Sequence, residues 1–297
     1  MSGATFIHHD GALGDVLLSL PCFGVIRENA ASVHIACRPD IAALLKETGC
    51  VDAVSSSDNS LFASLYSGPA DIRAKEFLCR FDRAFVFTIK QDSPFAANMK
   101  AVLPDTKTIL TVPPDDAPMH VAEFRVGQLA RGREMSASAL PDIPAVHRER
   151  ATDILARAGY HGGESLLVVL HPGSGGKGKR WPLENYFELA DTLSETYKPF
   201  FTLLLSGPAE ERGMKDAVES FARGRTNVLH VADEELITVA ALLSLCDLYV
   251  GNDSGITHLA AASGAEVIAL FGPTDQLLWK PLGGRVHIIS PPNGGFR

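Results

Sequence analysis

The sequence lacks the cysteine patterns, long apolar runs and leader that would assign it to a secreted or membrane class. Its five cysteines are scattered and form no C-x-x-C pair, which excludes a disulfide framework and a cysteine zinc site and predicts reduced thiols. No apolar run approaches the ~18 residues of a membrane span. The segment from Met1 to Asp15 has no basic stretch followed by an apolar one, so no signal peptide is expected. These absences predict a cytoplasmic protein.

Positively charged residues are also fewer than negatively charged ones. The 27 lysines and arginines are outnumbered by 35 aspartates and glutamates, which gives a formal net charge of −8. Duplex binding needs clustered cations that displace counterions, so nucleic acid is not expected as a partner. The balance still allows a local basic patch around a small anionic ligand.

Several familiar catalytic and cofactor motifs are missing as well. The chain contains no G-x-G-x-x-G fingerprint, no Walker A loop and no G-x-S-x-G nucleophile elbow. His8 and His9 are adjacent on an expected strand, so their side chains should point to opposite faces and are not expected to form a metal site. The sequence therefore indicates no cofactor and no metal.

Short apolar runs alternate with amphipathic stretches along the chain, as in βαβ units with parallel sheets. The length suits two domains, which we place at 1–150 and 151–297. A helix is expected over Asp15–Asn29 with a kink at Pro21, and Leu103–Pro118 is expected to be loop and sheet edge. Ligands of open α/β sheets bind outside the carboxyl ends of strands. The loops that directly follow strands are therefore the candidates for function.

The first such loop runs from Gly11 to Asp15. Gly11 and Gly14 permit a tight turn whose backbone can approach a ligand. Asp15 then lies at the start of a helix. It is either an N-cap carboxylate, which stabilises a helix by ~1 kcal/mol, or a carboxylate that faces a ligand.

The second loop runs from His171 to Pro182 and combines glycines with cations. Its four glycines, among them Gly173, free backbone N–H groups to surround an anion, and Ser174 lies between them. Lys179 and Arg180 add positive charge beside the N-terminus of the following helix. The alternative is a flexible surface loop without a ligand.

The third loop leaves a strand and opens a helix. Asp253 and Ser254 can cap this helix, and the free N–H groups from Gly255 onward can hold phosphate oxygens. His258 lies one turn later on the side of Ser254. The alternative is a capped turn that carries a core histidine.

Taken together, these segments resemble glycosyltransferase family 9, the ADP-heptose:lipopolysaccharide heptosyltransferases. The matching segments are Leu13–Pro21, His171–Ser174, Lys179–Pro182, Gly251–Ala260, Phe271–Asp275 and Trp279. The resemblance implies a GT-B fold, with two Rossmann-like α/β/α domains and a cleft between them. It also implies an N-terminal domain on the acceptor side, a C-terminal domain that binds the nucleotide sugar, and an inverting, metal-independent transfer.

The resemblance also assigns residue roles by motif position. Asp15 is similar to the family's proposed base, and Lys179 matches its phosphate-binding lysine. Glu210 lies where the family often holds the ribose. The residues expected to bind the nucleotide sugar are Gly14, Gly173, Ser174, Arg180, Glu210, Asp253, Ser254, Gly255 and His258. Family members are expected to continue past the position of Arg297 with further helices.

The expected donor is ADP-heptose, and the expected acceptor is the inner core of lipopolysaccharide. If the acceptor is lipid-linked, the protein must make transient contact with the inner membrane surface. Arg38 and Lys90 are candidate anion contacts on the acceptor side or ordinary surface charges. Two alternatives remain open: another nucleotide-sugar enzyme of the same fold, with a different donor or epimerase activity, and a non-catalytic nucleotide-sugar-binding homologue.

Overall fold

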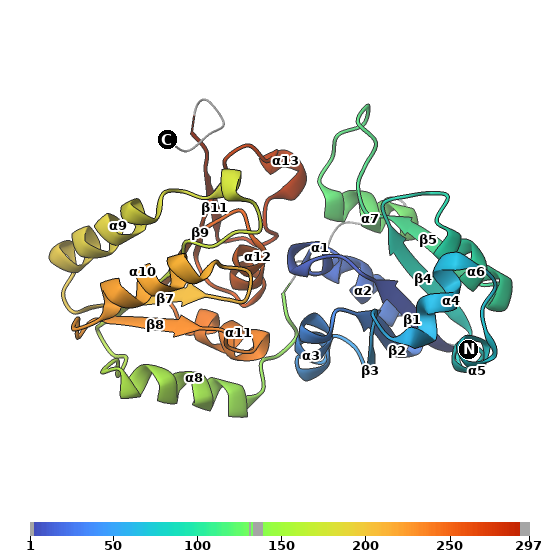
Figure 1. The fold of residues 1–297 in the computed structure, drawn as a ribbon, viewed down its shortest axis with the longest axis horizontal. Helices are drawn as coiled ribbons and strands as arrows, with labels where there is room; N and C mark the ends of the chain where they lie inside the picture. Colours follow the sequence, from blue (N-terminus) through green and yellow to red (C-terminus); the bar gives the residue numbers. More distant parts are fainter. Residues whose placement is uncertain (1–2, 131, 133–138, 292–297) are drawn as a thin grey trace. The chain divides into compact units, whose positions relative to one another are not determined.

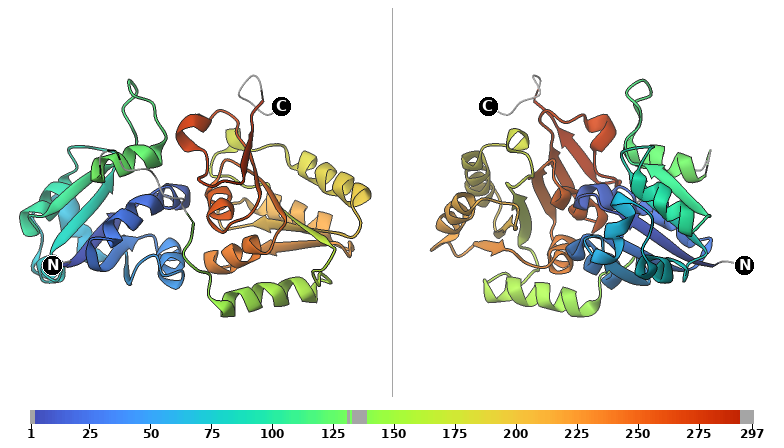
Figure 2. Two further views of the ribbon diagram at one scale, coloured as in Figure 1. Left: turned by 180° about the vertical axis from the view of Figure 1, so that it is seen from behind. Right: turned by 45° about the vertical axis from the view of Figure 1, so that its right-hand side comes forward.

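Two parallel β-sheets, each with helices on both faces, make up the two units of the chain (Figure 1, Figure 2). The computed structural model describes residues 3–130, 132 and 139–291. The N-terminal unit comprises Met1–Asp142 and the C-terminal unit Ile143–Arg297. No helix in the described part of the chain has the length and apolar character needed to cross a membrane.

The N-terminal unit has a sheet of five parallel strands in the order β3-β2-β1-β4-β5. Its strands are β1 (Gly3–His9), β2 (Ala30–Cys37), β3 (Ala53–Ser56), β4 (Arg83–Thr88) and β5 (Thr106–Leu110). Its helices are α1 (Leu13–Leu17), α2 (Leu20–Arg27), α3 (Pro39–Glu47), η1 (Ser60–Phe62), α4 (Ala63–Ser67), α5 (Ile72–Leu78), α6 (Pro94–Val102) and α7 (Val121–Leu129).

Aromatic side chains fill the core of this unit on both faces of β1. Phe6 contacts Phe62 and Phe77 on the face covered by η1, α4, α5 and α6. His9, three residues along the strand, stacks on Phe87 and meets Phe23 of α2 on the opposite face. The central strand is therefore covered on both sides, as the long apolar runs of parallel sheets require.

Pro21 starts a helix and does not kink one, so the expectation of a single kinked helix over Asp15–Asn29 is wrong. The helix breaks at Leu18–Ser19, and α2 begins with Leu20 and Pro21. A proline in the first turn has no intrahelical N–H bond to lose, and its fixed φ suits a helix start. The break leaves Ser19 buried beside the β1–α1 turn, where it becomes part of the site described below.

The C-terminal unit has a sheet of six parallel strands in the order β11-β10-β9-β6-β7-β8. Its strands are β6 (Leu166–His171), β7 (Phe200–Ser206), β8 (Val228–Ala232), β9 (Leu248–Asn252), β10 (Val267–Leu270) and β11 (Val286–Ile289). Its helices are α8 (Ala145–Arg157), η2 (Lys177–Lys179), α9 (Leu183–Thr196), α10 (Arg212–Ala222), α11 (Leu236–Ser244), α12 (Gly255–Ala262) and α13 (Gln276–Trp279).

Helices α9 and α10 cover one face of this sheet, and α8 and α11 cover the other (Figure 1). Every residue of β7 is buried, which explains why the strand is almost entirely apolar. Because α8 packs on α11, it belongs to the C-terminal unit. The expected division after residue 150 falls inside α8, whereas the units divide between Asp142 and Ile143.

Both sheets have the strand order of a Rossmann fold, in which the direction of winding reverses beside the first strand. The reversal lies between β1 and β4 in the N-terminal unit and between β6 and β9 in the C-terminal unit. Ligands of such sheets bind at the carboxyl ends of these strands. Asp15 lies in the first turn of α1, directly after the loop that follows β1, and the loops after β6 and β9 carry Lys179 and Ser254. The segment Leu103–Pro118, expected to be loop and edge, contains the edge strand β5.

Candidate functional site

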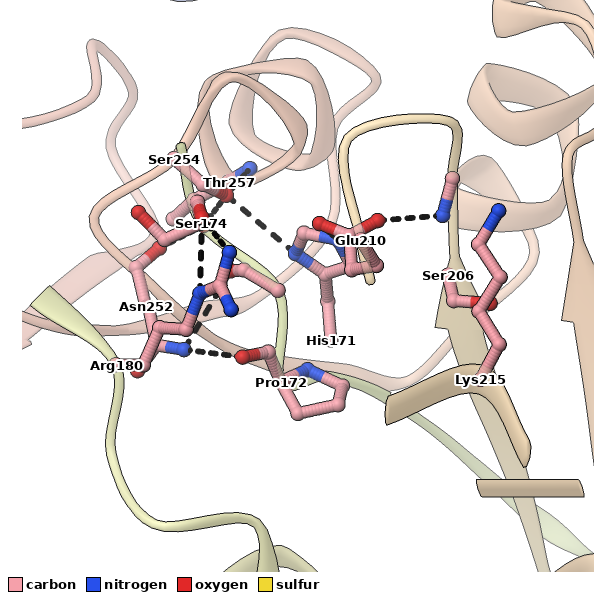
Figure 3. Close-up of polar contacts among 12 residues, drawn as sticks. His171, Pro172, Ser174, Arg180, Ser206, Glu210, Lys215, Asn252, Ser254 and Thr257 are labelled. Atoms are coloured by element: carbon pink, nitrogen blue, oxygen red, sulfur yellow. Dashed lines mark hydrogen bonds and ion pairs between the residues drawn. The ribbon is translucent and has the colours of Figure 1, made fainter. Parts of the chain in front are cut away.

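The side-chain amide of Asn252 joins the loops that follow β6 and β9 (Figure 3). Asn252 is the fully buried last residue of β9. Its Nδ2 donates to the carbonyl of Pro172 at 2.8 Å, and its Oδ1 accepts from the Trp181 N–H at 2.9 Å. The glycine-rich loop is thereby held at both ends by one buried side chain. Asn252 was not among the residues predicted for the site.

Lys179 and Asp253 form an ion pair within this arrangement. Lys179 Nζ lies 2.8 Å from Asp253 Oδ2, and the lysine side chain is 37% exposed whereas the aspartate is 6% exposed. The Ser174 hydroxyl donates to the Asp253 carbonyl at 2.8 Å. Arg180 donates from Nε and Nη2 to the Ser174 carbonyl, so its guanidinium braces the loop. Lys179 is thus a positioned, solvent-accessible cation.

Helix α12 begins beside this ion pair. Ser254 is its N-cap, and its Oγ accepts from the Thr257 N–H at 3.4 Å. Gly255 is the first helical residue, and His258 is buried one turn into the helix. The Thr257 hydroxyl donates to the carbonyl of Asn252, which ties the helix start to the end of β9. The first turn of an eight-residue helix presents backbone N–H groups and the positive end of its dipole here.

A buried, uncharged histidine at the end of β6 lies between the loops after β7 and β9. Burial and, to a smaller extent, the charge of nearby Arg180 lower the pKa of His171 to about 4, so the imidazole is neutral at physiological pH. Its Nδ1 lies 3.4 Å from Ser254 Oγ. On the other side, Glu210 Oε2 accepts from the Gly207 N–H at 2.6 Å, which closes the turn after β7. A Cβ at Gly173 would overlap the side chains of Glu210 and His171, so a larger residue here would displace the carboxylate.

A small, mainly apolar cavity opens next to His171. Its volume is about 50 Å³. Its walls come from the ends of β7 and β8, from the start of α11 and from Ile256 of α12. Leu205, Val231 and Val239 supply apolar surface, and Ser206 supplies a hydroxyl. A volume of this size accommodates about two water molecules, so the cavity could receive one edge of a flat, mostly apolar group.

Asp15 lies in the N-terminal unit, where a buried arginine holds it. Arg125 of α7 is fully buried, and its Nη2 lies 3.3 Å from Asp15 Oδ1. The Nη1 atom donates to the Asp15 carbonyl at 2.6 Å and to Ser19 Oγ at 2.8 Å, and Nε donates to the Thr111 carbonyl at 3.0 Å. The Asp15 side chain is nevertheless 34% exposed. One carboxylate oxygen is therefore anchored while the side chain still reaches solvent.

The same network includes a neutral histidine. The Gly11 N–H donates to His9 Nδ1 at 3.2 Å, so the proton of the neutral ring lies on Nε2, which donates to Ser19 Oγ at 3.0 Å. Burial keeps the pKa of His9 well below its usual value, with a further contribution from Arg125. The Ser19 hydroxyl can then donate to the Asp15 carbonyl at 3.1 Å. Every group around Arg125 thus has a matching donor or acceptor.

Among the predicted residues, the structure gathers those of the C-terminal unit at one end of its sheet. These residues are Gly173, Ser174, Lys179, Arg180, Glu210, Asp253, Ser254, Gly255 and His258. Gly14 and Asp15 lie in α1 of the N-terminal unit. The prediction omitted Asn252, His171 and Arg125. For Asn252 and His171 the available signal was a single polar residue at the end of an apolar strand, which is typical of a buried group with specific partners. Arg125 had no such signal, because α7 also contains Glu123 and Gln128.

Comparison with known proteins agrees with these observations. A sequence profile described as glycosyltransferase family 9 (heptosyltransferase) matches residues 139–295. Lipooligosaccharide heptosyltransferase 2 of Haemophilus influenzae is 30% identical over 139 residues, which are 43% of this chain and 37% of that protein. The match therefore spans little more than a third of that relative's length.

Two solved structures resemble the whole chain. The glycosyl transferase family 9 protein from Veillonella parvula aligns with a TM-score of 0.76 at 19% identity, over 97% of this chain and 86% of that one. Escherichia coli ADP-heptose lps heptosyltransferase II aligns with a TM-score of 0.74 at 19% identity, over 100% and 93%. These likenesses, with the two parallel sheets, confirm the predicted GT-B fold of two Rossmann-like domains.

Removal of the buried guanidinium should destabilise the N-terminal unit. Arg125→Met is expected to lower its free energy of unfolding by about 3 kcal/mol, because the Asp15 and Thr111 carbonyls and Ser19 lose a charged donor inside the protein. Urea unfolding followed by circular dichroism measures the change. Arg157→Met, at an exposed position of α8, is the control. Equal stabilities of the two variants would contradict the assigned role of Arg125.

His171 should make the C-terminal unit less stable in acid. Its folded-state pKa of about 4 lies below the ordinary value of 6.5. Between these values the unfolded chain binds a proton that the folded chain does not, so stability falls as the pH drops from about 6.5 towards 4. His171→Asn should reduce this slope by up to about 1.4 kcal/mol per pH unit, measured by urea unfolding at several pH values. The same change at exposed His161 is the control, and an unchanged slope in His171→Asn would refute the prediction.

Proposed function

Because this chain belongs to glycosyltransferase family 9, the heptosyltransferases, we propose that it transfers a heptose from ADP-heptose to a sugar acceptor of the lipopolysaccharide inner core. The observation that supports this best is the group at the carboxyl ends of β6 and β9. Lys179, the start of α12 and the glycine-rich loop converge there on one small region. A diphosphate is the natural ligand of a lysine beside a helix N-terminus.

The neighbouring cavity could receive one edge of the nucleobase of the donor. It adjoins His171, which lies between the proposed diphosphate region and the apolar walls of Leu205 and Val239. A neutral imidazole adds no charge that would repel the base or compete with Lys179 for the diphosphate. Glu210 follows β7 on the same side of His171, which suits the proposed contact with the ribose hydroxyls.

Asp253 orients Lys179 and can also contact the sugar of the donor. Its carboxylate accepts from Lys179 Nζ at 2.8 Å and has further lone pairs that could accept hydrogen bonds from sugar hydroxyls.

The proposed reaction is a single displacement that inverts the anomeric carbon. An acceptor hydroxyl attacks this carbon, the bond to the β-phosphate oxygen breaks, and ADP leaves with the electron pair. Asp15 takes the hydroxyl proton as the new bond forms, which contributes roughly 10²–10⁴-fold to the rate. Arg125 fixes the position of Asp15, and the exposed part of the carboxylate meets the acceptor.

Negative charge grows on the β-phosphate as the sugar leaves. Lys179 and the first N–H groups of α12 would stabilise this charge more in the transition state than in the bound donor. Fixed protein charges then perform the function that a divalent ion serves in other transferases. In this scheme the C-terminal unit binds the donor, and the N-terminal unit provides the base and the acceptor site. A lipid-linked acceptor would bring a cytoplasmic enzyme to the surface of the inner membrane.

Replacement of the base should abolish turnover but preserve donor binding. Asp15→Asn keeps the size of the side chain and an oxygen for Arg125 but cannot accept the hydroxyl proton. We expect the transfer rate to fall by at least about a hundredfold, while the Kd for ADP-heptose stays within about twofold. Lys179→Ala should instead weaken both donor binding and rate. Asp153→Asn, at an exposed position of α8, is the control, and near-normal turnover of Asp15→Asn would exclude Asp15 as the base.

Transfer should continue at its full rate in excess EDTA, because the leaving diphosphate is stabilised by Lys179 and the start of α12. Release of ADP from ADP-heptose in the presence of acceptor measures this directly. Addition of magnesium after EDTA is the control for side effects of the chelator. An absolute requirement for a divalent ion would overturn this scheme for the leaving group.

A further inference from the structure

A fully buried tyrosine of strand β9 reaches the start of α12. Tyr249 and Gly251 are two positions apart on β9, so their side-chain positions share one face of the sheet. A Cβ at Gly251 would overlap the Tyr249 hydroxyl, so this hydroxyl occupies the space that a side chain at position 251 would take. Glycine at this position therefore lets the phenol extend from the strand to α12, where its oxygen lies 2.9 Å from Thr257 Oγ1.

Three hydroxyl groups meet at the start of α12. Thr257 Oγ1 lies 2.9 Å from the Tyr249 oxygen and 3.1 Å from Ser254 Oγ. Ser254 and Thr257 are side by side in Figure 3. Tyr249 and Thr257 are fully buried, whereas Ser254 is only partly buried. Ser254 is therefore the member of this group that a ligand can reach.

Each hydroxyl has one hydrogen, and the contacts determine where two of the three hydrogens point. Thr257 donates its hydrogen to the Asn252 carbonyl, which cannot donate in return. Thr257 Oγ1 is therefore an acceptor towards Tyr249, and the Tyr249 hydroxyl donates to it. Burial raises the pKa of Tyr249, so the phenol keeps this hydrogen.

The third hydrogen, that of Ser254, has a choice of acceptors. Within the protein it can point to Thr257 Oγ1 or, at 3.4 Å, to His171 Nδ1. Thr257 Oγ1 already accepts from Tyr249, so it does not need Ser254 as a second donor. Ser254 Oγ meanwhile accepts from the Thr257 N–H. Its hydrogen can thus turn outward to an oxygen of a diphosphate at the start of α12.

We propose that Tyr249 is a positioning residue for the donor: it satisfies Thr257 and so leaves the Ser254 hydroxyl free to donate to the diphosphate. Without the phenol hydroxyl, the Ser254 hydrogen would turn inward to Thr257, since a buried acceptor that lacks a donor is unfavourable. Tyr249 acts through Thr257 and Ser254, because it is itself fully buried. This inference rests on the proposed function, which places the diphosphate of the donor beside Ser254.

Tyr249→Phe tests this role because it removes the hydroxyl and keeps the ring beside Gly251. We expect the Kd for ADP, measured by isothermal titration calorimetry on the whole protein, to rise about fivefold. Tyr186→Phe is the matched control, because Tyr186 is also fully buried and its hydroxyl has no hydrogen-bond partner among the residues that the structure describes. Its Kd for ADP should stay within about 1.5-fold of the wild-type value.

A double-mutant cycle with Ser254 separates positioning from a general loss of structure. If Tyr249 acts through the Ser254 hydroxyl, Tyr249→Phe should change the Kd for ADP by less than about 1.5-fold once Ser254→Ala has removed that hydroxyl. A merely structural effect of Tyr249→Phe would weaken ADP binding to the same extent in both backgrounds.

The proposal is overturned if Tyr249→Phe leaves the Kd for ADP unchanged, if the two losses are additive, or if ADP does not bind the wild-type protein. The binding assay contains no acceptor, so it is separate from the measurement of transfer. Additive losses in a protein that transfers heptose would refute the role of Tyr249 alone. Coupled losses in a protein that transfers no heptose would refute the transferase function alone.

Discussion

The buried amide of Asn252 is the contact on which the arrangement of the C-terminal site depends. A glycine-rich loop has few side chains to pack, so its position must be fixed through its backbone. Asn252 supplies this constraint because its own polar atoms, buried at the end of β9, must find partners. The Pro172 carbonyl and the Trp181 N–H are those partners. Lys179 lies between these two residues in the sequence and is thereby held beside Asp253.

The N-terminal site depends on an equivalent constraint, made by a buried charged group instead of a neutral amide. Here the buried group is the guanidinium of Arg125, and the groups that it orders belong to Asp15, Ser19 and Thr111. A buried charge is tolerated only when it is fully hydrogen-bonded. The neutral state of His9 contributes to this, because a second cation beside Arg125 would be strongly unfavourable. In both units, therefore, a neutral histidine accompanies the charged residues of the site.

Local patterns in the sequence were sufficient for the loops but not for the residues that anchor them. The glycine spacing around Gly173 and the helix cap at Ser254 are local features of the sequence. They predicted a loop after one strand and a helix start after another, and the structure has both. Asn252 contacts Pro172 and Trp181, which are 80 and 71 positions away in the sequence. Arg125 contacts Asp15 and Ser19, which are 110 and 106 positions away, as well as the nearer Thr111. A single sequence does not show which residues so far apart in the chain are in contact. The edge strand β5 was expected only as part of a loop-and-edge segment, because it lies among prolines and aspartates and its pairing with β4 is a tertiary contact.

In the proposed reaction, the two sites differ in electrostatic sign, and each sign suits one half of the transfer. The donor carries its charge on the diphosphate, which Lys179 and the start of α12 can neutralise. The acceptor hydroxyl gives up a proton as it attacks, and the carboxylate of Asp15 can accept it. Opposite charges in the two units would thus serve the leaving group and the nucleophile, although the chain as a whole carries a net charge of −8.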